Sequence, residues 1–287
     1  GKEGKYLTSR QIKERLEREL KFNVALRVAP TEVAQAFEVS GRGELHLAVL
    51  IETMRREGYE LALSQPEVIV KTDAEGHKTE PYETLVLDVQ TQHQGALMTY
   101  FGERSGVLEH MQECGVGRLR LDYIVPARSL LGFRSFFMTL TSGTGLMYPC
   151  FSHYGPLAKM PEKRRPEGAM IASISGQALG YALFNLQPRG QLMLKPQTQV
   201  YAGMVVGMHN RPQDLEVNVC KAKQLTNVRA SGTDENIMLT PALLLNLEQA
   251  MEWIEADEWV EVTPQSIRIR KRYLNSSDRR RHARQKD

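Results

Sequence analysis

The chain has 287 residues, a formal net charge of +3 and a hydrophobic content of 41%. That length can form two or three domains with cores of their own, and the composition is typical of ordinary globular proteins. No apolar run approaches the roughly 20 residues that span a bilayer, and no secretory signal heads the sequence, so we expect no membrane partner. Because the sequence begins with Gly1 instead of Met, we interpret it as a fragment of a longer protein.

The three cysteines, Cys114, Cys150 and Cys220, are widely spaced and follow no metal-ligand or CxxC pattern. They fit buried, small apolar side chains in a reducing cytosol. We therefore expect a cytoplasmic location, no disulfide and no metal site.

Residues 1–72 predict a small α+β unit. Apolar spacing and turn residues predict, in order, a helix from about residue 9, strands near 24–28 and 37–39 and a helix from about 44. A last strand is expected in the apolar stretch that follows, 59–63 and 68–70, which Pro66 interrupts. A ferredoxin-like βαββαβ unit has one more strand in front of this order. We expect that strand upstream of the fragment.

The stretch Ser40-Gly41-Arg42-Gly43-Glu44-Leu45-His46-Leu47 joins the second strand to the second helix. Its glycines allow a tight turn where a Cβ would clash. One interpretation is a structural corner in which Ser40 caps the helix and Glu44 lies in its first turn. The other is a helix N-terminus whose backbone N–H groups attract phosphate or carboxylate. The sequence leaves both open.

Residues 73–78 are polar and are expected to be a linker, and residues 79–155 predict a complete β-α-β-β-α-β unit. Arg118 and Arg120 alternate with Leu119 and Leu121, which places both arginines on one face of a strand. That face is either solvated or a phosphate contact, because guanidinium groups match phosphate oxygens.

Residues 156–287 predict a β-rich domain, a barrel or a curled sheet. An exposed basic loop with Arg164 and Arg165 opens it, and Asn246 with Gln249 forms a capping box for a late helix. The strands expected in this domain lie at 168–173, 178–184, 199–201, 205–209, 215–219 and 266–272.

The last of these strands places Arg268, Arg270 and Arg272 on one face. The tail after Asn275 has almost no apolar residues and is expected to be disordered when unbound. The chain is free of Lys and Arg from Ala230 to Ile267 and strongly basic from Arg268 onward. This segregation indicates either a basic arm for an anionic partner or a solvated tail.

A long polar stretch from Lys221 to Glu235 has too few apolar residues to pack as an element. Loops of this length are functional or disordered, and we favour function. Phosphates could be met by Lys221, Lys223 and Arg229, and ribose or base edges by Asn227, Ser231 and Thr233.

The corner at 40–47, with the string MRREGY at 54–59, resembles the corner of domain III in translational GTPases of the elongation factor G type. Four further strings resemble the TypA/BipA branch of that superfamily: VPARSLLGFRSFF (125–137), TSGTGLMY (141–148), FSHY (151–154) and RASGTDEN (229–236). Ser129 departs from this pattern, where a glycine is expected. By this resemblance, residues 1–72 and 79–155 correspond to domains III and V, and 156–287 to a family-specific domain.

The resemblance implies a ribosome-associated protein with roles in stress adaptation and large-subunit assembly. Its partners would be large-subunit rRNA and A-site tRNA, and its cofactors, GTP and Mg, would bind an N-terminal half that lies outside this sequence. The fragment carries no GxxxxGK[ST] phosphate loop and no legible Ser/His/Asp set. We therefore expect a monomeric ribosome-binding module without activity of its own. A protein-interaction module with merely solvated basic segments is the alternative, and an RNA-modifying enzyme is a third hypothesis that no catalytic set supports.

Overall fold

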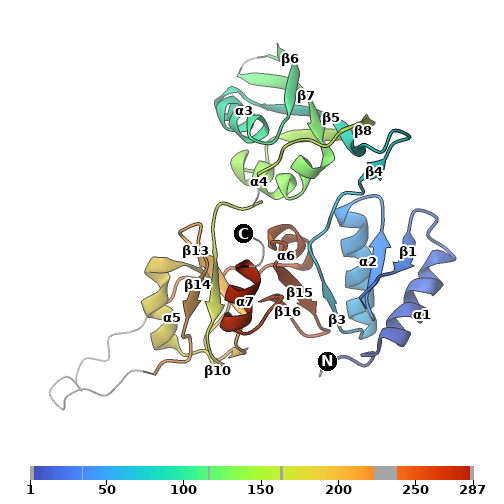
Figure 1. Cartoon of the computed structure of the whole chain (residues 1–287). Helices are drawn as coiled ribbons and strands as arrows, with labels where there is room; N and C mark the ends of the chain where they lie inside the picture. The colour runs from blue at the N-terminus through green and yellow to red at the C-terminus, as the bar shows by residue number, and fades with distance from the viewer. Residues whose placement is uncertain (1–2, 34, 116, 162–163, 223–237, 285–287) are drawn as a thin grey trace. The chain divides into compact units, whose positions relative to one another are not determined.

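The computed structural model describes residues 3–33, 35–115, 117–161, 164–222 and 238–284. The fold is α+β, and its contacts divide the chain into two compact units (Figure 1). Unit 1 combines Gly1–Gln65 with Arg165–Asp287, and unit 2 is Pro66–Arg164. The first and third segments expected from the sequence, 1–72 and 156–287, therefore contribute to one compact unit.

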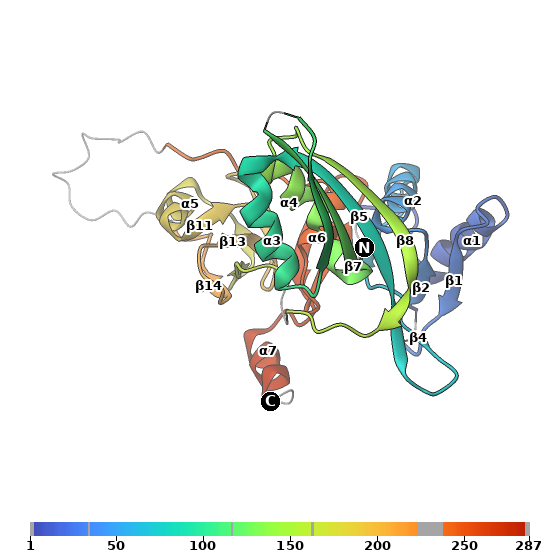
Figure 2. The ribbon, with the colours of Figure 1, turned by 90° about the horizontal axis from the view of Figure 1, so that it is seen from above.

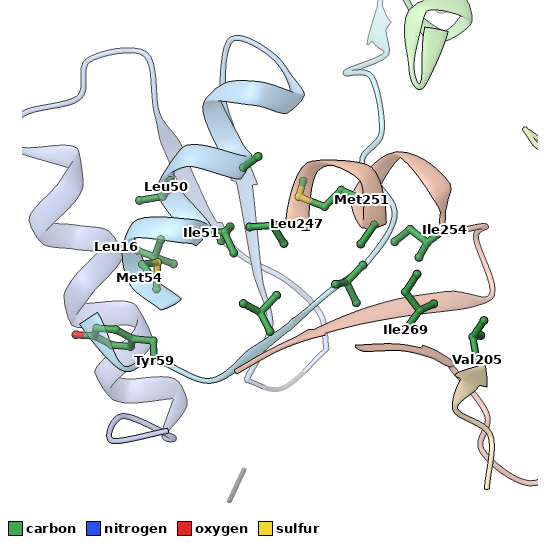
Figure 3. Close-up of a cluster of buried hydrophobic side chains, with 14 of the residues drawn as sticks. Leu16, Leu50, Ile51, Met54, Tyr59, Val205, Leu247, Met251, Ile254 and Ile269 are labelled. Atoms are coloured by element: carbon green, nitrogen blue, oxygen red, sulfur yellow. The ribbon is translucent and has the colours of Figure 1, made fainter. Parts of the chain in front are cut away.

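Segments near both ends of the chain share one of the cores of unit 1. Strand β3 pairs with β15, about two hundred residues away, and β15 pairs with β16. The core packs Leu16, Met54, Met251 and Ile269 from four elements against one another (Figure 3). The elements are α1 (Ser9–Leu20), β1 (Arg27–Pro30), β2 (Phe37–Ser40), α2 (Glu44–Glu57), β3 (Leu61–Leu63), α6 (Leu247–Trp253), β15 (Glu258–Val262) and β16 (Ile267–Lys271).

The α-β-β-α-β order of the first segment is confirmed, and its last strand is β3, which lies before Pro66. Residues 64–70 carry no regular structure, and Ile69 and Val70 are exposed. The apolar run at 68–70 has no neighbouring strand among the described residues, so its composition alone does not make it a strand.

The strand-to-helix corner joins β2 to α2, and its role as an anion-binding helix N-terminus stays a prediction. Gly43, not Ser40, is the N-cap of α2, and no side chain caps the helix. A Cβ on Gly41 would lie 2.7 Å from the ring of His46, whereas Gly43 is in open space. His46 connects the corner to the preceding loop, because Nδ1 accepts from the Arg42 N–H (3.2 Å) and Nε2 lies 2.8 Å from the Asn23 amide.

A second core of unit 1 is built on the mixed sheet β11-β13-β9-β14, in which β14 runs parallel to β9. The described strands of 156–287 form separate sheets instead of one barrel. The strand expected at 178–184 is wrong, since this stretch is mainly helix α5; short apolar runs do not distinguish a strand from a buried helix. The elements are β9 (Ala169–Ala172), β10 (Gly176–Gln177), α5 (Gly180–Leu186), η3 (Gln187–Arg189), β11 (Gly190–Leu192), β12 (Gln199–Val200), β13 (Val205–His209) and β14 (Leu215–Val217).

The tail after Asn275, expected to be disordered, forms helix α7 (Ser276–Ala283), which stands out from the sheets of unit 1 (Figure 2). None of the helices that the structure describes is long and apolar enough to cross a membrane.

Unit 2 has the predicted β-α-β-β-α-β order, with antiparallel strands arranged β6-β7-β5-β8. Leu97 and Phe101 of α3 and Phe133 and Phe137 of α4 cover one sheet face. A ferredoxin-like classification stays a prediction. The elements are β4 (Lys71–Thr72), β5 (Lys78–Gln90), η1 (Thr91–His93), α3 (Gln94–Gly102), β6 (Val107–Glu113), β7 (Arg118–Pro126), η2 (Ala127–Leu130), α4 (Phe133–Leu140) and β8 (Leu146–Pro156).

Two local features of unit 2 differ from expectation. The presumed linker at 73–78 is largely a tight hairpin between β4 and β5, in which Asp73 accepts from the N–H groups of Glu75 and His77 (2.9 and 2.8 Å). Ser129, where the family pattern has glycine, is buried and donates to the Pro126 carbonyl (2.7 Å). Its backbone has no positive φ, so this turn does not require glycine.

Candidate nucleic-acid interface

Strand β16 confirms the predicted alternation. Ile269 and Lys271 are buried on one face, with 6% and 2% exposed surface. On the other face Arg268 donates to Glu3 (2.7 Å), and Arg270 pairs with Glu261 (2.7 Å). Two of the three predicted RNA-contact arginines of this strand are thus already neutralised by carboxylates.

The partners of Arg268 form a small polar cluster. The hydroxyl of Thr263 donates to Glu3 at 2.6 Å. This hydrogen bond, followed by that of Arg268, lowers the pKa of the Glu3 carboxyl below its usual value. Glu3 therefore stays ionised beside Arg268, which is consistent with a structural ion pair.

Arg272 differs from its neighbours on β16. It is exposed, its guanidinium lies 5.7 Å from the centre of the Tyr273 ring, and it has no ion pair among the described residues. Arg272 is therefore available to an external anion.

The basic loop expected to be exposed at 156–166 is anchored at two of its basic residues, Arg164 and Arg165. Arg165 is 9% exposed, forms a bidentate ion pair with Glu258 (2.6 and 2.8 Å) and lies 3.5 Å above the Trp253 ring. Arg164 donates to the Pro66 carbonyl (2.7 Å). The expectation of an exposed loop was wrong at Arg165, since a buried glutamate captures this side chain.

In unit 2, Arg118 and Arg120 lie on the sheet face opposite the helices, as their alternation with buried Leu119 and Leu121 predicts. Arg118 pairs with Asp88 (2.7 Å), and Arg120 pairs with Asp122 (2.9 Å). Both pairs are partly exposed, so an RNA phosphate would have to compete with a carboxylate for each arginine.

Lys221 is exposed at the start of the long polar stretch. The other predicted contacts in that stretch lie outside the described residues: Lys223, Asn227, Arg229, Ser231 and Thr233. Thr240, which lies beyond that stretch, is held to the scaffold, because the Gln187 side chain accepts from its N–H and its hydroxyl (2.6 and 2.7 Å).

Helix α7 lies in the tail that was predicted to be either a basic arm for an anionic partner or solvated, but its arginines were not among the individual residues predicted to contact RNA. Arg280, Arg281 and Arg284 are exposed and have no ion pair within the described part of the chain. Asn275 before the helix and Asp278 in its first turn are residues typical of a helix start. The helix was not predicted because its residues show no apolar periodicity.

The described residues contain no group of three or more His, Cys, Asp or Glu that could hold a metal. Cys114 and Cys150 are exposed and Cys220 is half-buried, so the expectation of three buried cysteines was wrong. Burial raises the pKa of the Cys220 thiol, which disfavours the reactive thiolate.

Comparison with known proteins covers both units. The family model described as "TypA/BipA C-terminal domain" matches residues 167–276, and that described as "Elongation factor G C-terminus" matches residues 77–165.

Three relatives carry the name large ribosomal subunit assembly factor BipA. The chain is 57% identical to the protein of Salmonella typhimurium, 56% to that of Haemophilus influenzae and 51% to that of Buchnera aphidicola. Each comparison covers 98% of this chain and 46% of the relative, so the chain spans about half the length of the curated relatives it matches. The chain belongs to the TypA/BipA family of translational GTPases and corresponds to its C-terminal part.

Proposed function

We propose that this chain is the ribosome-binding module of a TypA/BipA-type GTPase and that it contacts large-subunit rRNA. The observation that carries the proposal is the exposure of two cationic side chains that have no ion pair among the described residues, Lys221 and Arg272. Cations of this kind release counterions from RNA when they meet phosphates. The name of the relatives, large ribosomal subunit assembly factor, supports the ribosome as the source of that RNA.

The predicted RNA-contact residues differ in whether their side chains already pair with a carboxylate. Lys221 and Arg272 can meet phosphate directly, whereas Arg118, Arg120, Arg268 and Arg270 must first exchange a carboxylate for it. Arg164 and Arg165 hold the scaffold together and are left out of the proposed contact set. The remaining cations of the long stretch, Lys223 and Arg229, stay in the set as a proposal from the sequence.

The finer functional assignments rest on the family resemblance. In this proposal the stretch from Lys221 to Glu235 reaches an A-site tRNA, with Asn227, Ser231 and Thr233 as the hydrogen-bonding residues. GTP and Mg bind the half of the protein that precedes this chain, and the whole protein acts in the cytoplasm in large-subunit assembly and stress adaptation. The domain correspondence, 1–72 to domain III and 79–155 to domain V, and a monomeric state are part of the same proposal.

Co-sedimentation with ribosomes across a potassium chloride series tests this function. The test variant is Lys221→Gln/Lys223→Gln/Arg229→Gln. A matched control, Arg10→Gln/Lys13→Gln/Arg18→Gln, removes the same charge from exposed positions of α1, where Arg10 and Lys13 pair with neighbouring glutamates. We expect the unmodified chain to pellet at low salt and the test variant to pellet less, with a salt slope lower by about one for each lost phosphate contact.

Two results contradict the proposal in different ways. If the unmodified chain stays in the supernatant at low salt, it is not a ribosome-binding module, and the protein-interaction alternative gains support. If it pellets and the test variant and the control bind equally well, the long stretch is not an RNA contact.

A further inference from the structure

Helix α7 has two chemically different faces. Ser276, Arg279 and His282, spaced three residues apart, are half-buried, and Arg280, Arg281 and Arg284 are exposed. Residues three apart lie on neighbouring positions of one helix face. One face of α7 is therefore turned to the body of unit 1, and the other consists largely of guanidinium groups in solvent.

The inner face is fixed by polar contacts. Arg279 donates to Glu216 on β14 (2.7 Å) and to the carbonyls of Tyr273 and Leu274 (3.0 and 2.6 Å). The His282 ring lies 4.6 Å from that of Tyr273. An eight-residue helix is marginal on its own, so these contacts order α7 and set the direction of its outer face.

The outer face carries charge that the described part of unit 1 does not neutralise. Arg280 and Arg284 are four residues apart and Arg281 and Arg284 three apart, so the like charges of each pair repel one another. The carbonyl end of the helix offsets part of this repulsion. An external anion that binds all three groups would relieve the rest.

We propose that this outer face of α7, Arg280, Arg281 and Arg284, is a separate binding surface for the phosphate backbone of structured RNA. The inference rests on the proposed function and adds a site to it. Guanidinium forks bind phosphate oxygens in bidentate fashion, and the groups of Arg280 and Arg284 are offset by about 6 Å along the helix axis.

The composition of the helix favours RNA over other polyanions. A membrane-surface helix needs an apolar face, but the inner face of α7 consists of Ser276, Arg279 and His282 and is occupied by its anchors. An acidic protein partner would need apolar or aromatic anchors at the centre of the interface. The outer face offers none, whereas a phosphate backbone requires only well-placed cations.

The test compares the chain with the variant Arg280→Gln/Arg281→Gln/Arg284→Gln, because glutamine keeps helix propensity while removing charge. The α1 variant Arg10→Gln/Lys13→Gln/Arg18→Gln is again the matched control. Binding is measured with purified large ribosomal subunits at salt concentrations from about 50 to 200 mM, where phosphate contacts dominate the salt dependence. Circular dichroism checks that each variant folds.

We expect the α7 variant to bind roughly tenfold or more weakly, with a salt slope lower by about 2 to 3, and the control to bind like the unmodified chain. If the unmodified chain binds and the α7 variant matches it in affinity and slope, the α7 site is refuted while the proposed function stands. If the unmodified chain fails to bind, both fail. Binding to phosphatidylserine vesicles that depends on α7, with subunit binding unchanged, would replace RNA by a membrane and overturn the inference.

Discussion

The strongest stability prediction concerns Glu258, which has no exposed surface and lies at the centre of a charge cluster. Its carboxylate accepts hydrogen bonds from both terminal nitrogens of Arg165 and lies 2.8 Å from the ammonium of Lys271. Lys271, itself 2% exposed, also meets Asp214 (2.6 Å) and Asp257 (2.9 Å). The substitution Glu258→Gln removes one charge and leaves two buried cations short of a partner.

The magnitude follows from the burial of this cluster. Breaking a buried ion pair by removing one partner costs about 3 to 5 kcal/mol. In the unmodified chain the Glu255 N–H also donates to the Glu258 carboxylate at 3.0 Å. The NH₂ group of the new glutamine would face another donor, either an N–H of Arg165 or the N–H of Glu255. We therefore expect Glu258→Gln to lower the free energy of unfolding of unit 1 by about 3 to 5 kcal/mol. Asp257→Asn, at a carboxylate whose side chain is 58% exposed, should cost about 1 kcal/mol or less.

The assay is urea denaturation followed by tryptophan fluorescence. The sequence has two tryptophans, Trp253 and Trp259, and both belong to unit 1. Fluorescence therefore reports unit 1 alone. With a slope of about 2 kcal/mol per molar urea, the midpoint of Glu258→Gln should fall by about 1.5 to 2.5 M. A shift no larger than that of Asp257→Asn would refute the view that this buried cluster holds unit 1 together.

The pH dependence of the same variant gives an independent check. Burial alone would raise the pKa of Glu258, but the charges of Arg165 and Lys271 outweigh it and hold the pKa below its usual value. A carboxyl with a lowered pKa stabilises the fold above its unfolded pKa of about 4.3, and this contribution is lost as the pH falls through the folded pKa. The stability difference between the unmodified chain and Glu258→Gln should therefore be full at neutral pH and shrink in acid.

Two further predictions concern unit 1 and use the same fluorescence assay. Gly203 has φ +89°, and a Cβ there would lie 2.7 Å from the Leu274 backbone; Gly203→Ala should cost about 1 to 3 kcal/mol, whereas Gly180→Ala, in open space, should be nearly neutral. Hydrogen bonding by Arg55 is the main cause that lowers the pKa of Glu52 from 4.5 to about 2. The ionised Glu52 therefore stabilises the fold by about 1 to 2 kcal/mol after solvent screening. This stabilisation is fully present above pH about 4.5 and is lost as the pH falls toward about 2. Glu52→Gln should remove this part of the acid sensitivity, and an unchanged acid profile would contradict the assignment.

The sequence pattern predicted a feature correctly where that feature depends on residues close together in the chain. The capping box of Asn246 and Gln249 is confirmed by reciprocal hydrogen bonds of 2.8 and 3.0 Å. The alternation along β16 is confirmed because period two follows from backbone geometry alone. Apolar alternation and turn residues also predicted the order of elements in unit 2, and the structure confirms that order.

The wrong predictions concern elements whose structure depends on residues far away in the sequence. The pairing of β3 with β15 has no local signal, so residues 61–63 could not be assigned to a shared sheet from sequence. Helix α7 depends on the contact of Arg279 with Glu216, which compensates for its lack of apolar residues. Sequence alone also gave no means to tell buried Arg165 from its neighbour Arg164.

The two roles of arginine in unit 1 also affect how binding data should be interpreted. Replacing Arg165 would leave Glu258 buried without its bidentate partner, and binding would fall because less of the chain is folded. Replacing Arg280 removes an exposed charge and leaves the anchors of α7 intact. Loss of folded protein lowers the apparent affinity without changing the number of phosphates met, whereas loss of a contact lowers the salt slope. The slope, rather than the affinity, therefore distinguishes an arginine that holds the fold from one that binds RNA.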